Sequence, residues 1–300
     1  MVRLKDILSF RHEADKASAL LPALMMRAEK VASGILHGDH ALRKAGAGEK
    51  FWQFREYEPG DRPQDIDWRQ SAKTENIYIR QREWQIAQKT FFWCSSGDGM
   101  AYSSAKTLPQ KLDVARVITL ALAILLSRAD EQIGMFGDSK TGRSELRLEQ
   151  IAQTLLDETK DPESLPAAGV FPVPQHSSLI LAGDFLEPLP HIAESFDYLS
   201  ASVQNALVVQ VLDPQELDLN FQGRVTFQGS RHGERETVNN VRSIQEQYKQ
   251  RIQNQIQGVY DLCAERNWTY ILHRTDQPLA DTVLEIWLMI GVTSGHGVPA

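Results

Sequence analysis

The pattern of apolar and polar residues changes near residue 86. Before it, apolar residues recur at helical spacing over residues 12–36, and the runs FWQFREY and NIYIRQREWQIA show the partial alternation of strands. After it, short apolar runs alternate with segments of helical period. We therefore predict an N-terminal helix with a small β-containing region over residues 1–86, followed by an α/β domain over residues 87–300.

The second part predicts a mainly parallel sheet with helices on both faces, because continuous apolar strands joined by helices are typical of such sheets. In these sheets, ligands gather at the carboxyl ends of the strands. We expect Ser95–Gly99, Gly183–Asp184 and Asp213 on that rim. The predicted strands are KTFFWCS, QIGMFG, SSLILAGDF, NALVVQVLDP and WTYILH, with SELRL as a short edge strand, and the predicted helices cover about 110–128, 148–159, 188–201, 236–264 and 278–290.

Composition and charge narrow the class of protein. The 300 residues are 42% hydrophobic and 24% charged, which is ordinary for a soluble globular protein. The net charge of −7 argues against nucleic-acid binding, which usually requires a basic surface. The N-terminus lacks the apolar core of a secretory signal, and the apolar run Val117–Leu126 is too short to span a bilayer. We expect a cytoplasmic protein with no membrane insertion of its own.

The cysteines and the glycine-rich segment predict no cofactor site. Cys94 and Cys263 sit in apolar surroundings without a CxxC pair, which favours two buried thiols over a zinc site. The segment RKAGAGEK lacks the GK[ST] ending of a phosphate-binding loop and the third glycine of a dinucleotide fingerprint. A turn is the better interpretation.

A serine hydrolase is the weakest functional alternative. The sequence contains no GxSxG and no HExxH motif. Ser95 and Ser96 lie where a nucleophile could sit, but nothing marks His176 or His273 as their base. We predict that the protein is not an enzyme and that it has no catalytic residues.

The stretch FREYEPGDRPQDIDWRQSAKT, residues 54–74, concentrates charge around a Pro-Gly turn. Paired carboxylates could carry out acid–base chemistry, but interleaved arginines more often form an ion-pair network that fixes a loop. Tyr57 and Trp68 could anchor this loop, and aromatic and arginine residues also suit binding surfaces. The sequence leaves two interpretations of this stretch open, a loop fixed by ion pairs and a binding surface. The candidate interaction residues are Arg55, Tyr57, Gly60, Asp61, Asp67, Trp68 and Arg69.

The same stretch resembles the signature of the bacterial family called domain of unknown function 58. Its pattern of F-x-x-x-R-x-Y-x-x-G-D, I-D-W and S-A-[RK]-T is matched in order from Phe51 to Thr74, and VLDPQELDL resembles the D-P-x-E stretch of the family. The resemblance covers about residues 30–290. It implies a von Willebrand factor A-like fold, and a role as an adaptor beside MoxR-type AAA+ ATPases in the assembly or maturation of client proteins.

Two departures from the family pattern bear on metal binding. Gln64 replaces an arginine before I-D-W, and Ser95, Gly97 and Gly99 replace the D-x-S-x-S metal ligands of von Willebrand A-type domains. Asp184 falls where a later acidic ligand would lie, with Asp98 and Ser95 as further weak candidates. We expect no cofactor, and we retain a Mg²⁺-dependent ligand-binding module as the alternative function.

Overall fold

The computed structural model divides the chain into two compact units, residues 1–40 with 88–300 and residues 41–87. The boundary predicted at residue 86 lies close to the observed one. The helix of residues 20–36 falls within the larger of these two units. The structure describes residues 20–36, 51–57, 66, 68–73, 77–82, 89–138, 140–157, 165–166, 177–228 and 235–293.

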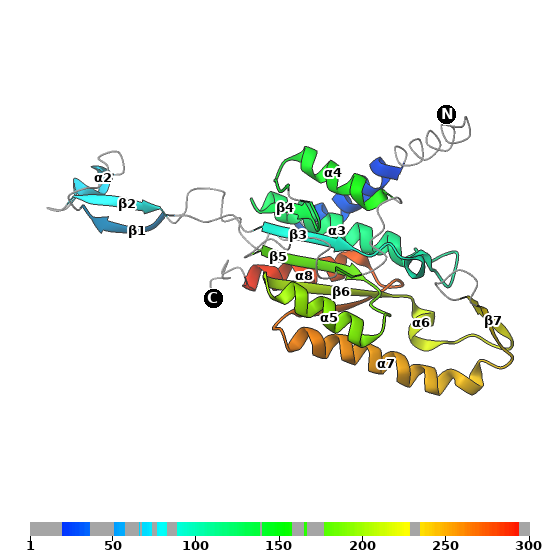
Figure 1. Ribbon diagram of the computed structural model, residues 1–300. Helices are drawn as coiled ribbons and strands as arrows, with labels where there is room; N and C mark the ends of the chain where they lie inside the picture. The colour runs from blue at the N-terminus through cyan, green and yellow to red at the C-terminus, as the bar shows by residue number, and fades with distance from the viewer. Residues whose placement is uncertain are drawn as a thin grey trace, which may run out of the picture. The chain divides into compact units, whose positions relative to one another are not determined.

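A parallel sheet of five strands forms the centre of the larger unit, in the order β4-β3-β5-β6-β9 (Figure 1). The predicted α/β class with a mainly parallel sheet is confirmed, and the arrangement is consistent with a Rossmann-like, von Willebrand factor A-like fold. The strands are β3 (Lys89–Cys94), β4 (Gln132–Met135), β5 (Ser177–Gly183), β6 (Val203–Leu212) and β9 (Thr269–Arg274).

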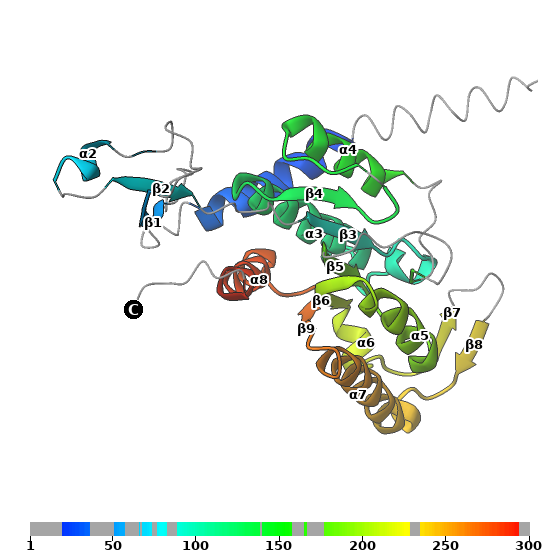
Figure 2. The same ribbon diagram turned by 60° about the vertical axis from the view of Figure 1, so that its left-hand side comes forward.

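Helices cover both faces of the sheet, because alternate strand residues point into two separate apolar clusters. In β3, Phe92 belongs to one cluster and Phe91 to the other. Figure 2 shows the two helical layers on either side of the strands. The first layer contains the helix of residues 20–36, α3 (Lys111–Arg128), α4 (Glu145–Leu156) and α8 (Leu279–Thr293), and the second contains α5 (Leu189–Ser200) and α7 (Arg242–Ala264).

The helix of residues 20–36 joins the α/β core through a face of small and aliphatic side chains. Ala28 and Ala32 are fully buried, and Leu24 lies in the same cluster as α3. An ion pair between Glu29 and Arg128, both exposed to solvent, borders this contact. Burial of this face explains why the helix groups with the α/β unit.

The segment SELRL forms the start of α4 and not the predicted edge strand. The hydroxyl of Ser144 accepts a hydrogen bond from the backbone N–H of Arg147 at 3.2 Å, which caps the helix. The buried Arg147 side chain donates to the carbonyls of Ile133 and Lys140 and pairs with Asp138. Capping and these contacts outweigh the alternating pattern that suggested a strand.

A strand pair and a short helix lie between β6 and α7. Helix α6 (Pro214–Asp218), which the sequence pattern did not predict, follows β6 directly. Strands β7 (Val225–Gln228) and β8 (Arg235–Val238) pair in antiparallel fashion. Because β8 uses residues at which a helix was predicted, α7 begins at Arg242 and not near residue 236.

The unit of residues 41–87 contains a two-stranded antiparallel sheet and one short helix. Both runs predicted as strands contain one, and β1 (Phe51–Glu56) pairs with β2 (Tyr78–Arg82). Helix α2 (Trp68–Ser71) is attached to β2, because the backbone N–H of Tyr78 donates to the hydroxyl of Ser71 at 2.8 Å.

Candidate functional site

The carboxyl ends of β3, β5 and β6 bring polar residues together at the point where the chain changes direction across the sheet. From β3 the chain continues through α3 to β4 on one side, and from β5 it continues through α5 to β6 on the other. Crevices at such points are the usual ligand sites of open α/β sheets. We call Lys111, Asp184, Asp213 and Glu216, which meet here, the rim cluster.

Lys111 is the centre of the rim cluster. Its side chain is fully buried, and its Nζ lies 2.9 Å from Asp184 Oδ2 and 2.6 Å from Glu216 Oε1. The two carboxylates are 18% and 15% exposed, so they form the outer wall over the ammonium. A buried charge is tolerated only when it is paired and hydrogen-bonded, and these two contacts supply that pairing.

A capping box holds Glu216 in place. The buried Asp213 caps α6 and accepts hydrogen bonds from the backbone N–H groups of Gln215 at 2.8 Å and of Ser104 at 3.0 Å. In return, Glu216 Oε2 accepts from the backbone N–H of Asp213 at 2.9 Å. One oxygen of Glu216 is therefore fixed by the cap, and the other faces Lys111.

Side-chain amides hold the loop that carries Asp184. Gln210 Nε2 donates to the Asp184 carbonyl at 2.7 Å, and the hydroxyl of Tyr270 donates to Gln210 Oε1 at 2.5 Å. From α7, Gln255 Nε2 donates to the carbonyls of Phe185 at 2.9 Å and Glu187 at 2.7 Å. These bonds stabilise the loop of residues 184–187, in which the backbone of Phe185 is left-handed with a φ of 49°.

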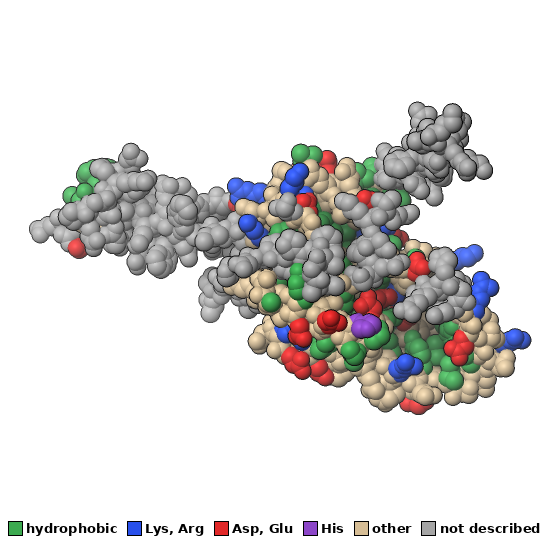
Figure 3. All heavy atoms as spheres, in the orientation of Figure 1, with side chains coloured by type: hydrophobic (Ala, Val, Ile, Leu, Met, Phe, Trp, Pro, Cys, Tyr) green, Lys and Arg blue, Asp and Glu red, His purple; other side chains and the backbone are tan. Residues whose placement is uncertain are grey.

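The electrostatics of the rim follow from burial and from the excess of carboxylates. Burial raises the pKa of Glu216, and the neighbouring Lys111 opposes this increase. Burial and the charge of Asp184 also raise the pKa of Glu187. Burial raises the pKa values of Tyr102 and Tyr248 to about 12, with a further contribution from the Glu216 charge. Figure 3 shows acidic side chains spread over this face of the larger unit, some of them beside a histidine.

The weak candidates for metal ligands, Ser95, Asp98 and Asp184, lie on neighbouring loops at the rim. Ser95 is buried next to Gly183, while Asp98 is exposed on the 3-10 helix η2 (Asp98–Ala101). Gly99 lies so close to Asp184 that a Cβ there would be 3.1 Å from Oδ2, an oxygen that already accepts from Lys111. Among the described residues, no group of three or more His, Cys, Asp or Glu side chains could hold a metal ion. The rim residues therefore fit a hard dication poorly.

The structure does not bring the described candidate base to the rim serines. His273 lies on β9, so β5 and β6 separate it from β3 and Ser95. Its Nδ1 is 2.7 Å from the hydroxyl of Thr282, and its ring is buried. His176 lies outside the described residues.

The comparisons with known proteins support the family suggested by the signature. The family model described as "Protein of unknown function DUF58" matches residues 53–257. The chain belongs to the DUF58 family. The match includes most of β1, all of β2 and the whole rim cluster, so the family pattern extends over both units.

Mycobacterial proteins are similar in sequence to this DUF58 chain. The uncharacterized proteins Mb1516 of Mycobacterium bovis and Rv1480 of Mycobacterium tuberculosis are each 24% identical to it over 233 residues, covering 73% of this chain and 72% of each relative. No solved structure matches. Neither name states an activity.

The signature residues of the DUF58 chain are only partly described. Arg55 lies on β1, while Gly60, Asp61 and Asp67 lie outside the described residues. Trp68 is 65% exposed at the start of α2, and Tyr57 is 36% exposed. The Trp68 ring therefore lies mostly in solvent, while most of the loop that it was expected to anchor lies outside the described residues.

Sequence reasoning missed Lys111 and did not place Glu216 in the site. The sequence did indicate that Lys111 is unusual, because a lysine is unfavourable beside the positive N-terminal end of a helix. A compensating negative partner was therefore to be expected. For Glu216, the D-P-x-E stretch was noted only as a family feature. Its chemistry is that of a capping box at the rim.

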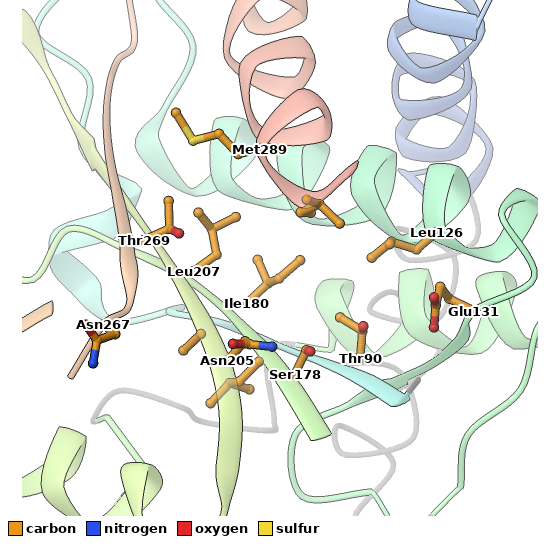
Figure 4. A pocket seen from close by; sticks show the side chains of 13 residues that line it. Thr90, Leu126, Glu131, Ser178, Ile180, Asn205, Leu207, Asn267, Thr269 and Met289 are labelled. Atoms are coloured by element: carbon orange, nitrogen blue, oxygen red, sulfur yellow. The ribbon is translucent and has the colours of Figure 1, made fainter. Parts of the chain in front are cut away.

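A cavity of about 100 Å³ lies at the opposite, amino edge of the sheet, beneath α8 (Figure 4). Its described lining combines hydroxyl and amide side chains with aliphatic ones and includes a single ionisable residue, Glu131. This cavity lies at the edge opposite to the one where parallel sheets usually bind ligands. We therefore keep the rim and the exposed signature helix as the candidate sites.

None of the described helices is a candidate membrane span. In the part of the chain that the structure describes, no helix combines the length and the apolar composition needed to cross a bilayer.

Proposed function

We propose that the chain is a non-enzymatic, cytoplasmic adaptor that works with a MoxR-type AAA+ ATPase in the assembly or maturation of client proteins. The observation that carries this proposal is the state of the rim, where Lys111, Asp184 and Glu216 satisfy one another. The class of partner comes from the resemblance of the signature stretch to its family and is an analogy.

The rim supports a structural role better than a catalytic one. A general acid or base needs an ionisable group that can reach a substrate proton, and a nucleophile needs a base within hydrogen-bond distance. Here the Lys111 ammonium is enclosed, and both Asp213 carboxylate oxygens accept backbone N–H groups. These side chains hold the loops at the carboxyl ends of the strands in place, which favours a rigid surface for a partner.

The unit of residues 41–87 offers the better contact surface. Trp68 is 65% exposed, Ile77 is 43% exposed and Arg69 is also exposed. Exposed tryptophan and arginine are the residue types most enriched at the energetic centres of protein interfaces. The attachment of α2 to β2 through Ser71 and Tyr78 presents Trp68 from a fixed element, which reduces the entropy lost on binding.

The alternative of a Mg²⁺-dependent binding module receives less support from the geometry. Such a module needs oxygen ligands that are free to meet the ion. The oxygen of Asp184 that faces the rim is held by the Lys111 ammonium, and glycines stand at two of the ligand positions.

The adaptor proposal is tested by measuring the affinity of the purified chain for a purified MoxR-type ATPase by calorimetry, with and without ATP and Mg²⁺. We expect binding by the wild type and a loss of at least about tenfold for Trp68→Ala, because truncating an interface tryptophan usually costs more than 1 kcal/mol. Leu146→Ala is the matched control, since Leu146 is an exposed apolar residue, 63% exposed, on the α/β unit.

Three results would count against the proposal in different ways. Absence of binding by the wild type would remove the partner class, and equal binding by Trp68→Ala would remove the signature helix as the contact. Loss of binding in EDTA without nucleotide, together with loss in Asp184→Ala, would favour the Mg²⁺-dependent module. Labelling of Ser95 or Ser96 by a serine-directed phosphonate probe would instead support a hydrolase.

A further inference from the structure

We propose that the Lys111 ammonium is a built-in cation that occupies the position of a divalent metal ion between Asp184 and Glu216, and that removing it creates a Mg²⁺ or Mn²⁺ site there. This inference goes beyond the adaptor function and does not depend on it. It concerns why the rim keeps its carboxylates close together without a metal ion.

Asp184 and Glu216 converge on the Lys111 ammonium. Two carboxylate oxygens from distant parts of the chain lie 2.9 and 2.6 Å from a single point, the Nζ atom of Lys111. Asp184 and Glu216 are separated from Lys111 by 73 and 105 positions in the sequence, so the fold and not local chain geometry brings them together. Mg²⁺ is commonly held by one or two carboxylates and completes its coordination with water. Both carboxylates are partly exposed, so water can reach them.

The charge of Lys111 opposes the binding of a dication at the rim. Lys111 contributes one positive charge against the negative charges of Asp184 and Glu216. A dication entering the wild-type rim would meet an ammonium within contact distance of the same oxygens, and repulsion between cations at that distance is strong in a partly buried site. Without the ammonium, the two carboxylates would repel each other and would attract a divalent ion.

Bonds that do not involve Lys111 hold the Glu216 side chain and the Asp184 backbone in place. Glu216 is fixed by the capping box with Asp213, and the Asp184 backbone is fixed by Gln210. Gln255 holds the two carbonyls that follow on the same loop. None of these bonds involves the lysine side chain, so the pair of ligands should persist when the ammonium is removed.

The test compares the wild type with Lys111→Met, which keeps an apolar stem and removes the ammonium, using Mn²⁺ as the probe. Mn²⁺ binding is followed by electron paramagnetic resonance, and thermal unfolding is measured in EDTA and in excess Mg²⁺ or Mn²⁺. We expect no Mn²⁺ binding and an unchanged midpoint for the wild type. For Lys111→Met we expect a lower midpoint in EDTA, one bound Mn²⁺, and recovery of the midpoint in either ion. Lys106→Met, which removes an exposed lysine, is the matched control and should behave as the wild type.

The double variant Lys111→Met/Asp184→Asn assigns the site, because it should lose the Mn²⁺ binding that Lys111→Met gains. If Lys111→Met does not fold in EDTA, refolding in Mn²⁺ replaces the melt, and folding only with Mn²⁺ supports the proposal. The proposal is overturned if the wild type binds Mn²⁺ and Asp184→Asn abolishes that binding. It is equally overturned if Lys111→Met binds no Mn²⁺ or fails to fold in either condition.

Discussion

The rim cluster and the unit of residues 41–87 place their charged and aromatic side chains in opposite ways. At the rim, Lys111 and Asp213 are fully buried and bound to carboxylate or backbone groups. In the smaller unit, Trp68 and Arg69 are exposed. The rim uses polar groups to hold strand ends in place, whereas the signature helix presents them to solvent.

The buried ion pairs at the rim join residues 73 and 105 positions apart, so proximity in the sequence does not indicate them. Long-range pairs of this kind have strong energetic consequences, because removing one partner leaves a buried charge uncompensated.

The largest effect is expected at the rim, for Asp213→Ala. The substitution removes the cap of α6 and leaves the N–H groups of Ser104 and Gln215 without their acceptor. Loss of a cap and of buried hydrogen bonds should lower the free energy of unfolding by about 3 kcal/mol. Urea denaturation monitored by circular dichroism provides the measurement.

Asp218→Ala provides the control for that experiment. Asp218 lies at the end of the same short helix, and its backbone carbonyl, which the substitution keeps, accepts from Gln245. We expect a loss of less than about 0.5 kcal/mol, as for most surface substitutions. Equal losses of unfolding free energy in the two variants would mean that the Asp213 cap contributes no more to stability than the Asp218 side chain does.

An intermediate effect is expected from acid, through His273. The ring is buried, and burial lowers its pKa from 6.5 to about 4, although Asp276 opposes this shift. Between these values the unfolded chain binds a proton that the folded chain does not, so stability is present above pH 6.5 and is lost as the pH falls towards 4. At 1.36 kcal/mol per pH unit, acidification from pH 7 to pH 5 should cost about 2 kcal/mol.

His273→Gln tests the origin of this acid sensitivity. The variant should have a flatter dependence of unfolding free energy on pH between 5 and 7, even if its stability at pH 7 is lower. His191→Gln changes an exposed histidine at the start of α5 and should keep the wild-type slope. A slope that is unchanged in His273→Gln would show that another group causes the acid sensitivity.

The strands and long helices could be predicted because their patterns are local. Continuous apolar runs became β3, β5 and β6, and a helical period with an apolar interior became α3. The errors occurred where a few specific bonds decide the structure. Ser144 turns SELRL into a helix, and the pairing of β7 with β8 delays the start of α7.

The candidate site could be placed on an edge of the sheet but not assembled in detail. The parallel-sheet pattern correctly placed Asp184 and Asp213 directly after the carboxyl ends of neighbouring strands. It could not show that the lysine at the start of α3 reaches between Asp184 and Glu216, because such contacts depend on packing between distant segments. The exposure of Trp68 was equally beyond reach, since an aromatic residue in an alternating loop suits an anchor and a contact surface alike.

The smallest effect on stability is expected for Trp68→Ala, and this prediction tests the comparison most directly. A side chain that is 65% exposed loses little buried apolar surface on truncation. We therefore expect the free energy of unfolding to change by less than about 0.5 kcal/mol, measured by urea denaturation beside Asp213→Ala. A large loss would make Trp68 a structural residue and would move any change in partner binding from contact to unfolding. Unchanged stability together with weaker binding would assign its exposed ring to the partner, because only an interaction absent from the free protein can affect affinity and leave folding intact.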